Sequence, residues 1–510
     1  MNDDSSIKRL TRLGHRGISR RRVLEMTALG LAGTLLPTAP LVGRAFANDD
    51  RDRGRRRRVL LKGGFVLTLD EKIGDLPQGD VLIEGEKIEA IGRHLHDGGD
   101  AEVINCSEMI VMPGLIDTHR HMWQGLLRNI GPDDVLDDYV KKILFGYALK
   151  MWPEDVYLGD TISALSAMSS GITTILDWSH IANTPAHTEA AIHALQDAKI
   201  RAVYGYGPSF GLSPAWYDSA SPGGYPQYIR TLRRKFFNTS DQLLTLALAA
   251  AGPEFSLLGV RSSLIEWKIA REVGARISVH VGVGKQSDAR GLQQMGRMGL
   301  LKNDTTYIHC CTLNDIEMKM IADTGGTVSL AVPIEMQMGH GMPPIQKFLD
   351  LGVRPSLSVD VETNQPSDMF TQMHACFALQ RALYNESHKD DCFFEFTFVS
   401  PVACKAKLLN TRDVLKFATI EGARANELLR KTGTLTPGKQ ADVILLRAEQ
   451  INVAPVNDVV GSIVLGMDRS NVDSVFIAGN AVKRSGQLVG VDVNRIARDA
   501  EEAREKLLKR

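Results

Sequence analysis

The chain has 510 residues, 44% of them hydrophobic and 24% charged, which is enough for one large domain or two ordinary ones and excludes a disordered chain, a collagen or a repeat array. The 60 basic and 60 acidic residues cancel, so bulk charge gives no support to nucleic-acid binding. Six cysteines without a CxxC spacing argue against a disulfide scaffold or a structural zinc module.

The first 47 residues have the three parts of a secretory signal. Arg20 and Arg21 lie in a basic segment, a mostly apolar run follows over residues 26–42, and residues 45–47 read Ala-Phe-Ala, a small-x-small cleavage signal. The apolar run contains two prolines and is shorter than the roughly 20 residues that a membrane-spanning helix needs. We therefore expect a twin-arginine signal peptide over residues 1–47. It would export the folded protein to the periplasm or beyond, without a stable membrane anchor.

β-rich segments lie at both ends of the remaining chain. After a basic linker over residues 48–58, residues 59–112 contain alternating β-branched stretches bounded by glycines. Residues 431–490 have the same character, with Gly479-Asn480 as the expected hairpin turn. We expect the two parts to pair into one small β-sandwich domain, followed by a surface helix over residues 491–510.

Between these parts, residues 113–430 alternate short apolar runs with stretches of helix length. This alternation is typical of a parallel sheet with crossover helices, and eight such units in about 250 residues match a (β/α)₈ TIM-like barrel, so the expected fold class is α/β. Active sites of such barrels lie at the C-terminal ends of the strands. The expected strand ends lie near His119, Asp177, Tyr206, Ala251, His280, His309, Ala331 and Asp360.

Four of these strand ends carry side chains that can bind a metal. His119 and His121 have the i, i+2 spacing that places two side chains on one face of a strand. His280, His309 and Asp360 end three other strands. Imidazoles and a carboxylate at one rim suit zinc or ferrous iron with one water retained.

The sequence resembles the amidohydrolase superfamily, in particular the branch with triazine chlorohydrolases and guanine deaminase. The resemblance runs along nearly the whole chain after the signal, and its motifs lie at residues 113–119, 171–174, 418–423 and 433–442. Members with two metals bridge them with a carboxylated lysine on the fourth barrel strand. Residues 243–249 contain no lysine, so a single metal is expected.

The resemblance implies a role for each residue of the rim. The HxH pair, the fifth-strand histidine and the eighth-strand aspartate would bind one divalent ion, with zinc favoured over iron; these are His119, His121, His280 and Asp360. His309 would orient the attacking water or the reacting group of the substrate and would contact the substrate. Gln124 and Trp123 are expected to contact the substrate as well.

The expected reaction is hydrolysis of a non-peptide carbon–nitrogen bond in a small cyclic or heteroaromatic compound, by an amidohydrolase or deaminase mechanism. The metal lowers the pKa of its water. Asp360 would take the water proton and deliver it to the leaving group, and His309 would stabilise charge at the attacked carbon, so these two are the expected catalytic residues.

One position departs from the family pattern. Ring deaminases of this branch have a glutamate three residues after the fifth-strand histidine, where it protonates a ring nitrogen, and Val283 stands there in this chain. Glu254, Glu335 and Glu362 are the alternative acids. The departure leaves open a carbon–halogen or carbon–carbon bond as the target, or a barrel that binds a metal or ligand without turnover.

Two further histidines, His180 and His340, follow other strands and are interpreted as loop residues that could line the pocket. The expected partner is a small-molecule substrate, and a homo-oligomer is compatible with the sequence. No nucleic-acid or membrane-surface patch is recognisable.

Overall fold

The computed structural model describes residues 57–209, 224–256, 258–392 and 408–510. The expected signal peptide and nearly all of the basic linker lie outside these residues. Within the described part of the chain, no helix combines the length and apolar character needed to cross a membrane.

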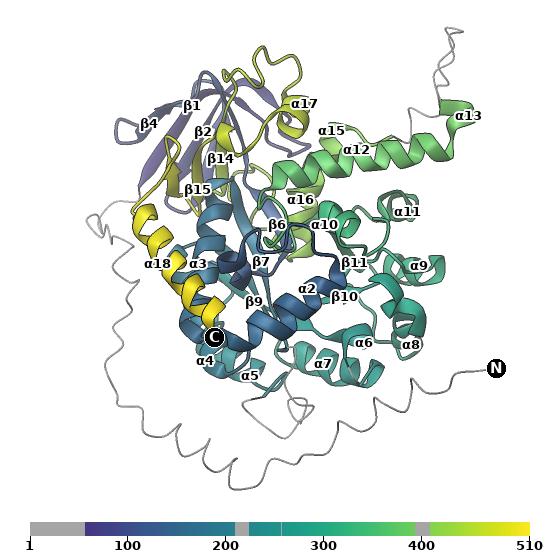
Figure 1. Cartoon of the computed structure of the whole chain (residues 1–510). Coiled ribbons are helices and arrows are strands. Elements are labelled where there is room, and N and C mark those ends of the chain that lie inside the picture. Colours follow the sequence, from purple (N-terminus) through teal and green to yellow (C-terminus); the bar gives the residue numbers. More distant parts are fainter. Residues whose placement is uncertain (1–56, 210–223, 257, 393–407) are drawn as a thin grey trace, which may run out of the picture. The chain divides into compact units, whose positions relative to one another are not determined.

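Eight parallel strands form one sheet whose order follows the sequence (Figure 1). They are β6 (Leu115–Arg120), β7 (Ile172–Ser179), β8 (Arg201–Tyr206), β9 (Leu244–Ala250), β10 (Arg276–Val281), β11 (Thr305–His309), β12 (Thr327–Leu330) and β13 (Ser356–Leu357). Arg120 and Asp360 form a parallel bridge that joins the last strand to the first. The expected (β/α)₈ barrel is confirmed, and each of its strands ends within three residues of the expected position.

The barrel interior is filled by apolar side chains. Trp178 on β7 is fully buried and belongs to a cluster with Ala247 and Ala249 on β9, whose small side chains leave room for the indole. Around the barrel lie η2 (Met122–Leu127), α2 (Leu136–Tyr139), η3 (Val140–Tyr147), η4 (Ala148–Lys150), α3 (Pro153–Ser169), α4 (Pro185–Ala198), α5 (Ile229–Lys235), α6 (Gly252–Phe255), α7 (Val260–Glu272), η6 (Gly284–Ala289), α8 (Gly291–Arg297), α9 (Asp315–Asp323), α10 (Val332–Gln337), α11 (Ile345–Asp350), α12 (Met369–Ser387), α13 (Lys389–Cys392), α15 (Thr411–Phe417) and α16 (Ile420–Ala425). Proline at the first helical position starts α3 and α4, because its fixed φ suits a helix and its missing N–H is not needed there.

Strands from the two chain ends form a second, nine-stranded mixed sheet. Its strands are β1 (Arg58–Val66), β2 (Leu76–Glu84), β3 (Lys87–Gly92), β4 (Glu102–Asn105), β5 (Met109–Pro113), β14 (Val443–Arg447), β15 (Val472–Ile477), β16 (Asn480–Arg484) and β17 (Gln487–Leu488). The two ends join where β5 pairs with β14, with Val111 opposite Leu445. Both residues lie in one buried cluster with Val59 and Phe476, so the expected β domain built from both ends is confirmed.

The turn between β15 and β16 lies at Ala478 and Gly479, one residue before the expected position. Their φ values of 45° and 73° are those of the tight hairpin turn that matches strand twist. A short helical segment, α17 (Val459–Gly461), continues into η7 (Ser462–Gly466), and η8 (Arg469–Asn471) precedes β15.

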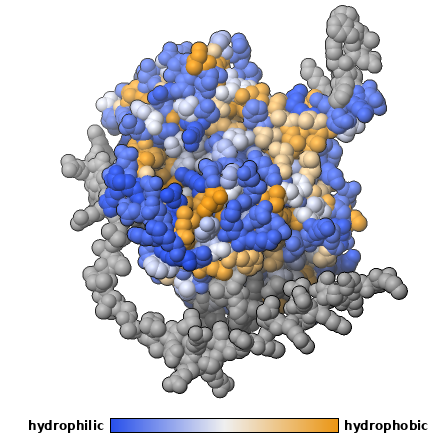
Figure 2. Space-filling model, in the orientation of Figure 1, coloured by the Kyte–Doolittle hydropathy of each residue, from blue (hydrophilic) through white to orange (hydrophobic). Residues whose placement is uncertain are grey.

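The chain ends in helix α18 (Val493–Lys509), as expected for the charged tail. Ile496 and Leu507 are buried, whereas the outer face is hydrophilic (Figure 2). The terminal Arg510 forms an ion pair with Asp155, and its guanidinium lies 3.8 Å from the centre of the Trp152 ring. These contacts fix the end of α18 at the start of α3.

The backbone of η2 contacts the backbone of α3 where the two segments cross. A Cβ atom on Gly159 of α3 would lie 2.3 Å from the carbonyl oxygen of Trp123, and one on Gly125 would lie 2.2 Å from the carbonyl oxygen of Gly159. No side chain fits between the two backbones, so the glycines set the position of η2 and of its residues Trp123 and Gln124.

Gly159→Ala is therefore expected to lower the free energy of unfolding by about 2 kcal/mol, the usual scale of overpacking. Helix propensity alone predicts the opposite sign, because alanine is favoured over glycine inside a helix by roughly 1 kcal/mol. Denaturant unfolding of the wild type and the variant measures the difference. An equal or higher stability of the variant would contradict the close crossing.

Candidate metal centre

Four side chains from the barrel rim converge on one point. They come from β6, from the residue after its end, from β10 and from the loop after β13, and their coordinating atoms lie within 4.8 Å of one another: His119, His121, His280 and Asp360. Asp360 Oδ1 lies 2.9 Å from His119 Nε2 and 3.3 Å from His121 Nε2. His280 Nε2 lies 3.2 Å from His119 Nε2. The structure thus brings together the four residues expected to bind the metal.

The closure of the barrel fixes this geometry. The amide of Asp360 donates to the carbonyl of His119 (2.9 Å), and the amide of His121 donates to the carbonyl of Asp360 (2.8 Å). Asp360 and His309 adopt φ values of 69° and 70°, a left-handed conformation that is costly for residues other than glycine and is common at functional sites. The junction between the first and the last strand of the barrel therefore directs the Asp360 side chain toward His119 and His121.

Asp117 stabilises the junction between the first and the last strand of the barrel. Its Oδ1 accepts from the amides of Val359 (3.1 Å) and His119 (3.3 Å), and its Oδ2 accepts from Nε of Arg120 (2.8 Å). Both Asp117 and Arg120 are fully buried, so the ion pair compensates two charges that burial would otherwise make costly. The carboxylate of Asp117 thus links the backbone of the first strand to the backbone that follows the last strand.

The histidine and aspartate side chains are in the protonation states that binding of a cation requires. Burial lowers the pKa of His119 to about 3 and that of His309 to about 4, which keeps both rings neutral. Burial by itself would raise the pKa of Asp360, but the adjacent His119 and His121 hold it well below its ordinary value. Nδ1 of His121 donates to the carbonyl of Trp178 (2.8 Å), which leaves the Nε2 lone pair facing the centre. Neutral imidazoles and an anionic carboxylate fit a divalent cation.

His309 lies beside this set. Its Nε2 is 3.7 Å from Asp360 Oδ2, and its Nδ1 donates to Glu335 Oε1 (3.1 Å), which also accepts from the amide of Ala331 (2.8 Å). Glu335, one of the alternative acids, thus orients His309. No sequence pattern indicates this pairing, because Glu335 lies on α10 after a different strand.

The two residues expected to contact substrate are placed by η2. Gln124 is fully buried and its Nε2 donates to the hydroxyl of Tyr139 (2.5 Å). Trp123 is also fully buried and donates from Nε1 to Nδ1 of His180 (3.0 Å). The His180 ring stacks on His121 with 3.9 Å between centroids, so His180 supports a ligand and is more than a loop residue.

The remaining alternative acids differ in environment. Glu362 is buried and pairs with Arg120 and Arg128, and although burial alone would raise its pKa, these cations lower it. Glu254 accepts from the amide of Gly282 (2.8 Å), next to Val283, and burial raises its pKa to about 7. Glu362 is therefore a structural anion, whereas Glu254 can exchange a proton near neutral pH.

The raised pKa of Glu254 predicts a pH-dependent stability. The folded state binds this proton more tightly than the unfolded state, so stability is unaffected below pH 4.5 and falls as the pH rises from 4.5 to about 7. Glu254→Gln removes this loss, so the variant is expected to be more stable than the wild type by about 3 kcal/mol at pH 8, with little difference at pH 4. Denaturant unfolding at the two pH values measures this. A difference that does not change with pH would contradict the prediction.

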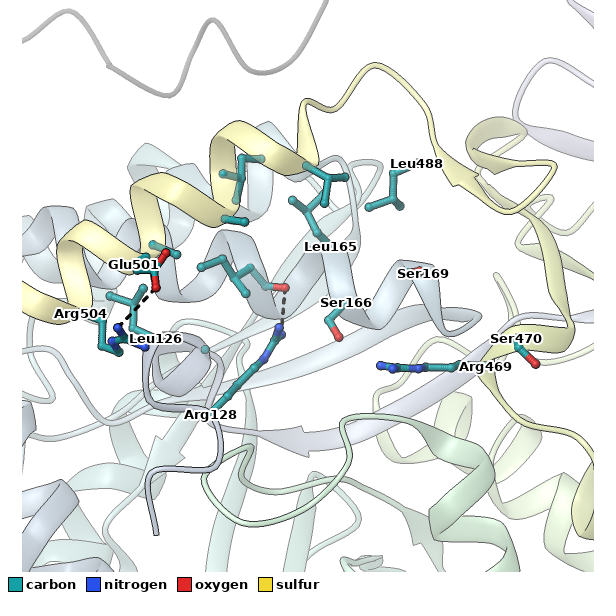
Figure 3. Close-up of a pocket in the computed structure, with 16 residues that line it drawn as sticks. Leu126, Arg128, Leu165, Ser166, Ser169, Arg469, Ser470, Leu488, Glu501 and Arg504 are labelled. Atoms are coloured by element: carbon teal, nitrogen blue, oxygen red, sulfur yellow. Dashed lines mark hydrogen bonds and ion pairs between the residues drawn. The ribbon is translucent and has the colours of Figure 1, made fainter. Parts of the chain in front are cut away.

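A cavity of about 740 Å³ lies elsewhere, between α18, α3 and η2 (Figure 3). Its lining includes Arg128, which donates to the carbonyl of Ile162 (3.1 Å), and Arg504, which pairs with Glu501. None of the four candidate ligands is among the residues that line it, so this cavity is separate from the metal centre.

A parallel α/β barrel with three histidines and an aspartate at its C-terminal rim defines a metal-dependent hydrolase. The chain belongs to the amidohydrolase family, whose sequence profile matches residues 110–482. The family confirms the resemblance in the sequence, and with it the expected enzyme class, a hydrolase that acts on carbon–nitrogen bonds other than peptide bonds.

Relatives match almost the full length of their own chains. The 5'-deoxyadenosine deaminase of Methanosarcina barkeri is 27% identical over 465 residues, covering 89% of this chain and 99% of the relative. The 5-methylthioadenosine/S-adenosylhomocysteine deaminase of Caldanaerobacter subterraneus is 24% identical over 462 residues, covering 88% and 99%.

Solved structures share the fold. An adenosine deaminase from Xanthomonas campestris with bound zinc has a TM-score of 0.76 and 19% identity, covering 89% of this chain and all of that one. The atrazine chlorohydrolase of Arthrobacter aurescens, in complex with zinc, has a TM-score of 0.73 and 20% identity, covering 88% and 100%.

Proposed function

We propose that the protein hydrolyses the bond between a ring carbon and an exocyclic amino group in a heteroaromatic compound, and that it releases ammonia. The observation that carries this proposal is the convergence of the four ligands with His309 next to Asp360 Oδ2. The deaminases of 5'-deoxyadenosine and related nucleosides among its relatives favour a 6-aminopurine ring as the substrate class.

The ion bound by His119, His121, His280 and Asp360 is proposed to be zinc. Zinc binds imidazole nitrogen and carboxylate oxygen and can expand to five ligands, so the three imidazoles and one carboxylate leave a position for a water. The adenosine deaminase and the atrazine chlorohydrolase with the same fold contain zinc.

The residues around the ion have separate roles in the proposed reaction. When bound, the divalent cation supplies a water of lowered pKa as the nucleophile. Asp360 accepts the water proton at Oδ2 and transfers it to the departing amine. His309, whose Nδ1–H is engaged by Glu335, offers its Nε2 lone pair to orient that water. His280 is the most exposed of the four ligands, so we place the approach of the substrate on its side.

A second candidate reaction displaces a halide from the ring. The buried Val283 favours it, because valine cannot protonate a ring nitrogen at the position where the family's deaminases have glutamate. Halide is a better leaving group than an amine and does not need a proton.

An assay of leaving groups tests both reactions. The zinc-loaded protein is incubated with 6-aminopurine nucleosides, aminopyrimidines and chlorotriazines, and free ammonia and chloride are measured. We expect ammonia from an aminopurine at a rate at least 100-fold above that of His309→Ala, because a positioned acid–base group contributes at least that factor. Chloride without ammonia would support the second reaction, and neither product would contradict both.

We also propose that residues 1–47 export the folded, metal-loaded protein by the twin-arginine route. Arg20→Lys together with Arg21→Lys is expected to retain the protein in the cytoplasm. Fractionation of cells that express the wild type and the double variant measures the distribution. Equal amounts in the periplasm would contradict this route.

A further inference from the structure

The cavity between α18, α3 and η2 has a volume of about 740 Å³, which lies in the usual range for sites that bind small molecules. Among the described residues of its lining, three are arginines, Arg128, Arg469 and Arg504, and one is a carboxylate, Glu501. Arg504 pairs with Glu501, and Arg128 pairs with Glu362, which lies outside the lining. The positive charge of Arg469 is therefore left without an anion in the cavity.

Arg469 belongs to η8, and its guanidinium extends into the cavity toward Ser166 of α3 (Figure 3). Within the described ranges of the chain, its side chain forms no hydrogen bond or ion pair. A second cation lies nearby, because Nζ of Lys483 donates to the carbonyl of Ser169 (2.6 Å), another lining residue. Burial lowers the pKa of Lys483 to about 8, and the cations Arg447 and Arg469 contribute to this shift. Such an excess of positive charge attracts an anion.

Arg128 follows η2 and is held in place at the other side of the cavity (Figure 3). Its Nε pairs with Glu362, and its Nη2 donates to the carbonyl of Ile162 (3.1 Å). Among the residues that the structure describes, these contacts leave Nη1 without a partner, and 34% of the side chain is exposed. A guanidinium that is already fixed loses less conformational entropy when it binds a carboxylate.

Most of the remaining lining is apolar. It includes Val493, Ile496 and Ala500 of α18, together with Leu126 of η2 and Leu165 of α3 (Figure 3). Ile496 is buried, whereas Val493, which lies one turn away on the same face of α18, is 52% exposed. The apolar face of α18 thus extends beyond the part that the protein covers. A ligand with an apolar chain would remove this surface from water.

We propose that the cavity binds a soluble amphipathic monocarboxylate, such as the anion of a medium-chain aliphatic acid, with its carboxylate between Arg469 and Arg128 and its chain along α18. One carboxylate matches the one unpaired charge, and arginine binds carboxylates through two parallel hydrogen bonds. None of the four candidate metal ligands lines the cavity, so this inference does not rest on the proposed function. The bound ligand also holds η2, the segment that carries Trp123 and Gln124.

Calorimetric titration of the purified full chain with octanoate tests the site. Octanol is the neutral probe of the same chain length, and hexanoate is the shorter anion. We expect one octanoate per chain, affinity that rises about fourfold for each methylene added to hexanoate, and at least tenfold weaker binding of octanol. Equal affinity for octanol and octanoate, equal affinity for hexanoate and octanoate, or no saturable binding of octanoate would overturn the proposal.

Variants locate the bound octanoate. Arg469→Gln is expected to weaken octanoate binding at least tenfold and to leave octanol binding unchanged. Ala500→Phe, at a half-buried lining position, is expected to weaken both by occupying the space of the chain. The exposed Arg297→Gln on α8, outside the lining, is the matched control and should bind octanoate as the wild type does. Full affinity in a folded Arg469→Gln, as judged by circular dichroism, would place octanoate elsewhere and overturn the site.

Discussion

Asp360→Asn is expected to lower kcat at least 10³-fold and to weaken binding of the metal ion. The amide removes the negative charge from the centre and cannot accept the water proton, and proton transfer alone contributes 10²–10⁴-fold. Asparagine tolerates the left-handed backbone at φ 69°, so the fold and the closure of the barrel should persist. Ammonia release and metal content of the purified variant measure the two effects.

His309→Asn is the informative companion to this variant. It lowers turnover while the four candidate ligands remain, so the metal ion should still bind. The exposed Asp323→Asn on α9 controls for the loss of a carboxylate and should leave both quantities unchanged. Full turnover or full metal affinity in Asp360→Asn would exclude a shared role for this carboxylate as ligand and base.

The barrel and the convergence of the four candidate ligands were predictable because both are encoded locally. An apolar run that ends in a polar residue marks the end of a buried strand, and the carboxyl ends of parallel strands meet at one rim. The HxH spacing adds a second local signal for His119 and His121. His280 and Asp360 then follow from their positions at other strand ends.

The surroundings of the ligands were not predictable, because they depend on loops and helices from distant parts of the chain. Glu335 contacts His309 from α10, and Arg128 pairs with Glu362 across more than 200 residues. The buried position of His340 depends on the path of a loop flanked by Gly339 and Gly341. Such contacts have no fixed spacing in the sequence.

A buried ion pair joins the barrel to the second sheet. Arg201 at the start of β8 donates from two nitrogens to Asp442 (2.6 and 2.9 Å), and the side chains are 1% and 0% exposed. Asp442 also accepts from the amide of Ala478 (2.8 Å), and its carbonyl accepts from the amide of Gly114 (3.0 Å). The carboxylate of Asp442 thus links β8 to the hairpin of the second sheet, and its backbone carbonyl links the same residue to Gly114, just before β6.

Arg201→Met is expected to lower the free energy of unfolding by about 4 kcal/mol, because it leaves Asp442 charged, buried and without its cation. Adding Asp442→Asn should restore part of this stability, since a neutral amide is less costly to bury and can still accept from Ala478. The exposed pair Lys319–Asp323 is the control, and Lys319→Met should change stability by less than about 1 kcal/mol. Denaturant unfolding measures all three. A double variant less stable than Arg201→Met would show that the Asp442 charge itself stabilises the junction and that its burial is not the dominant cost.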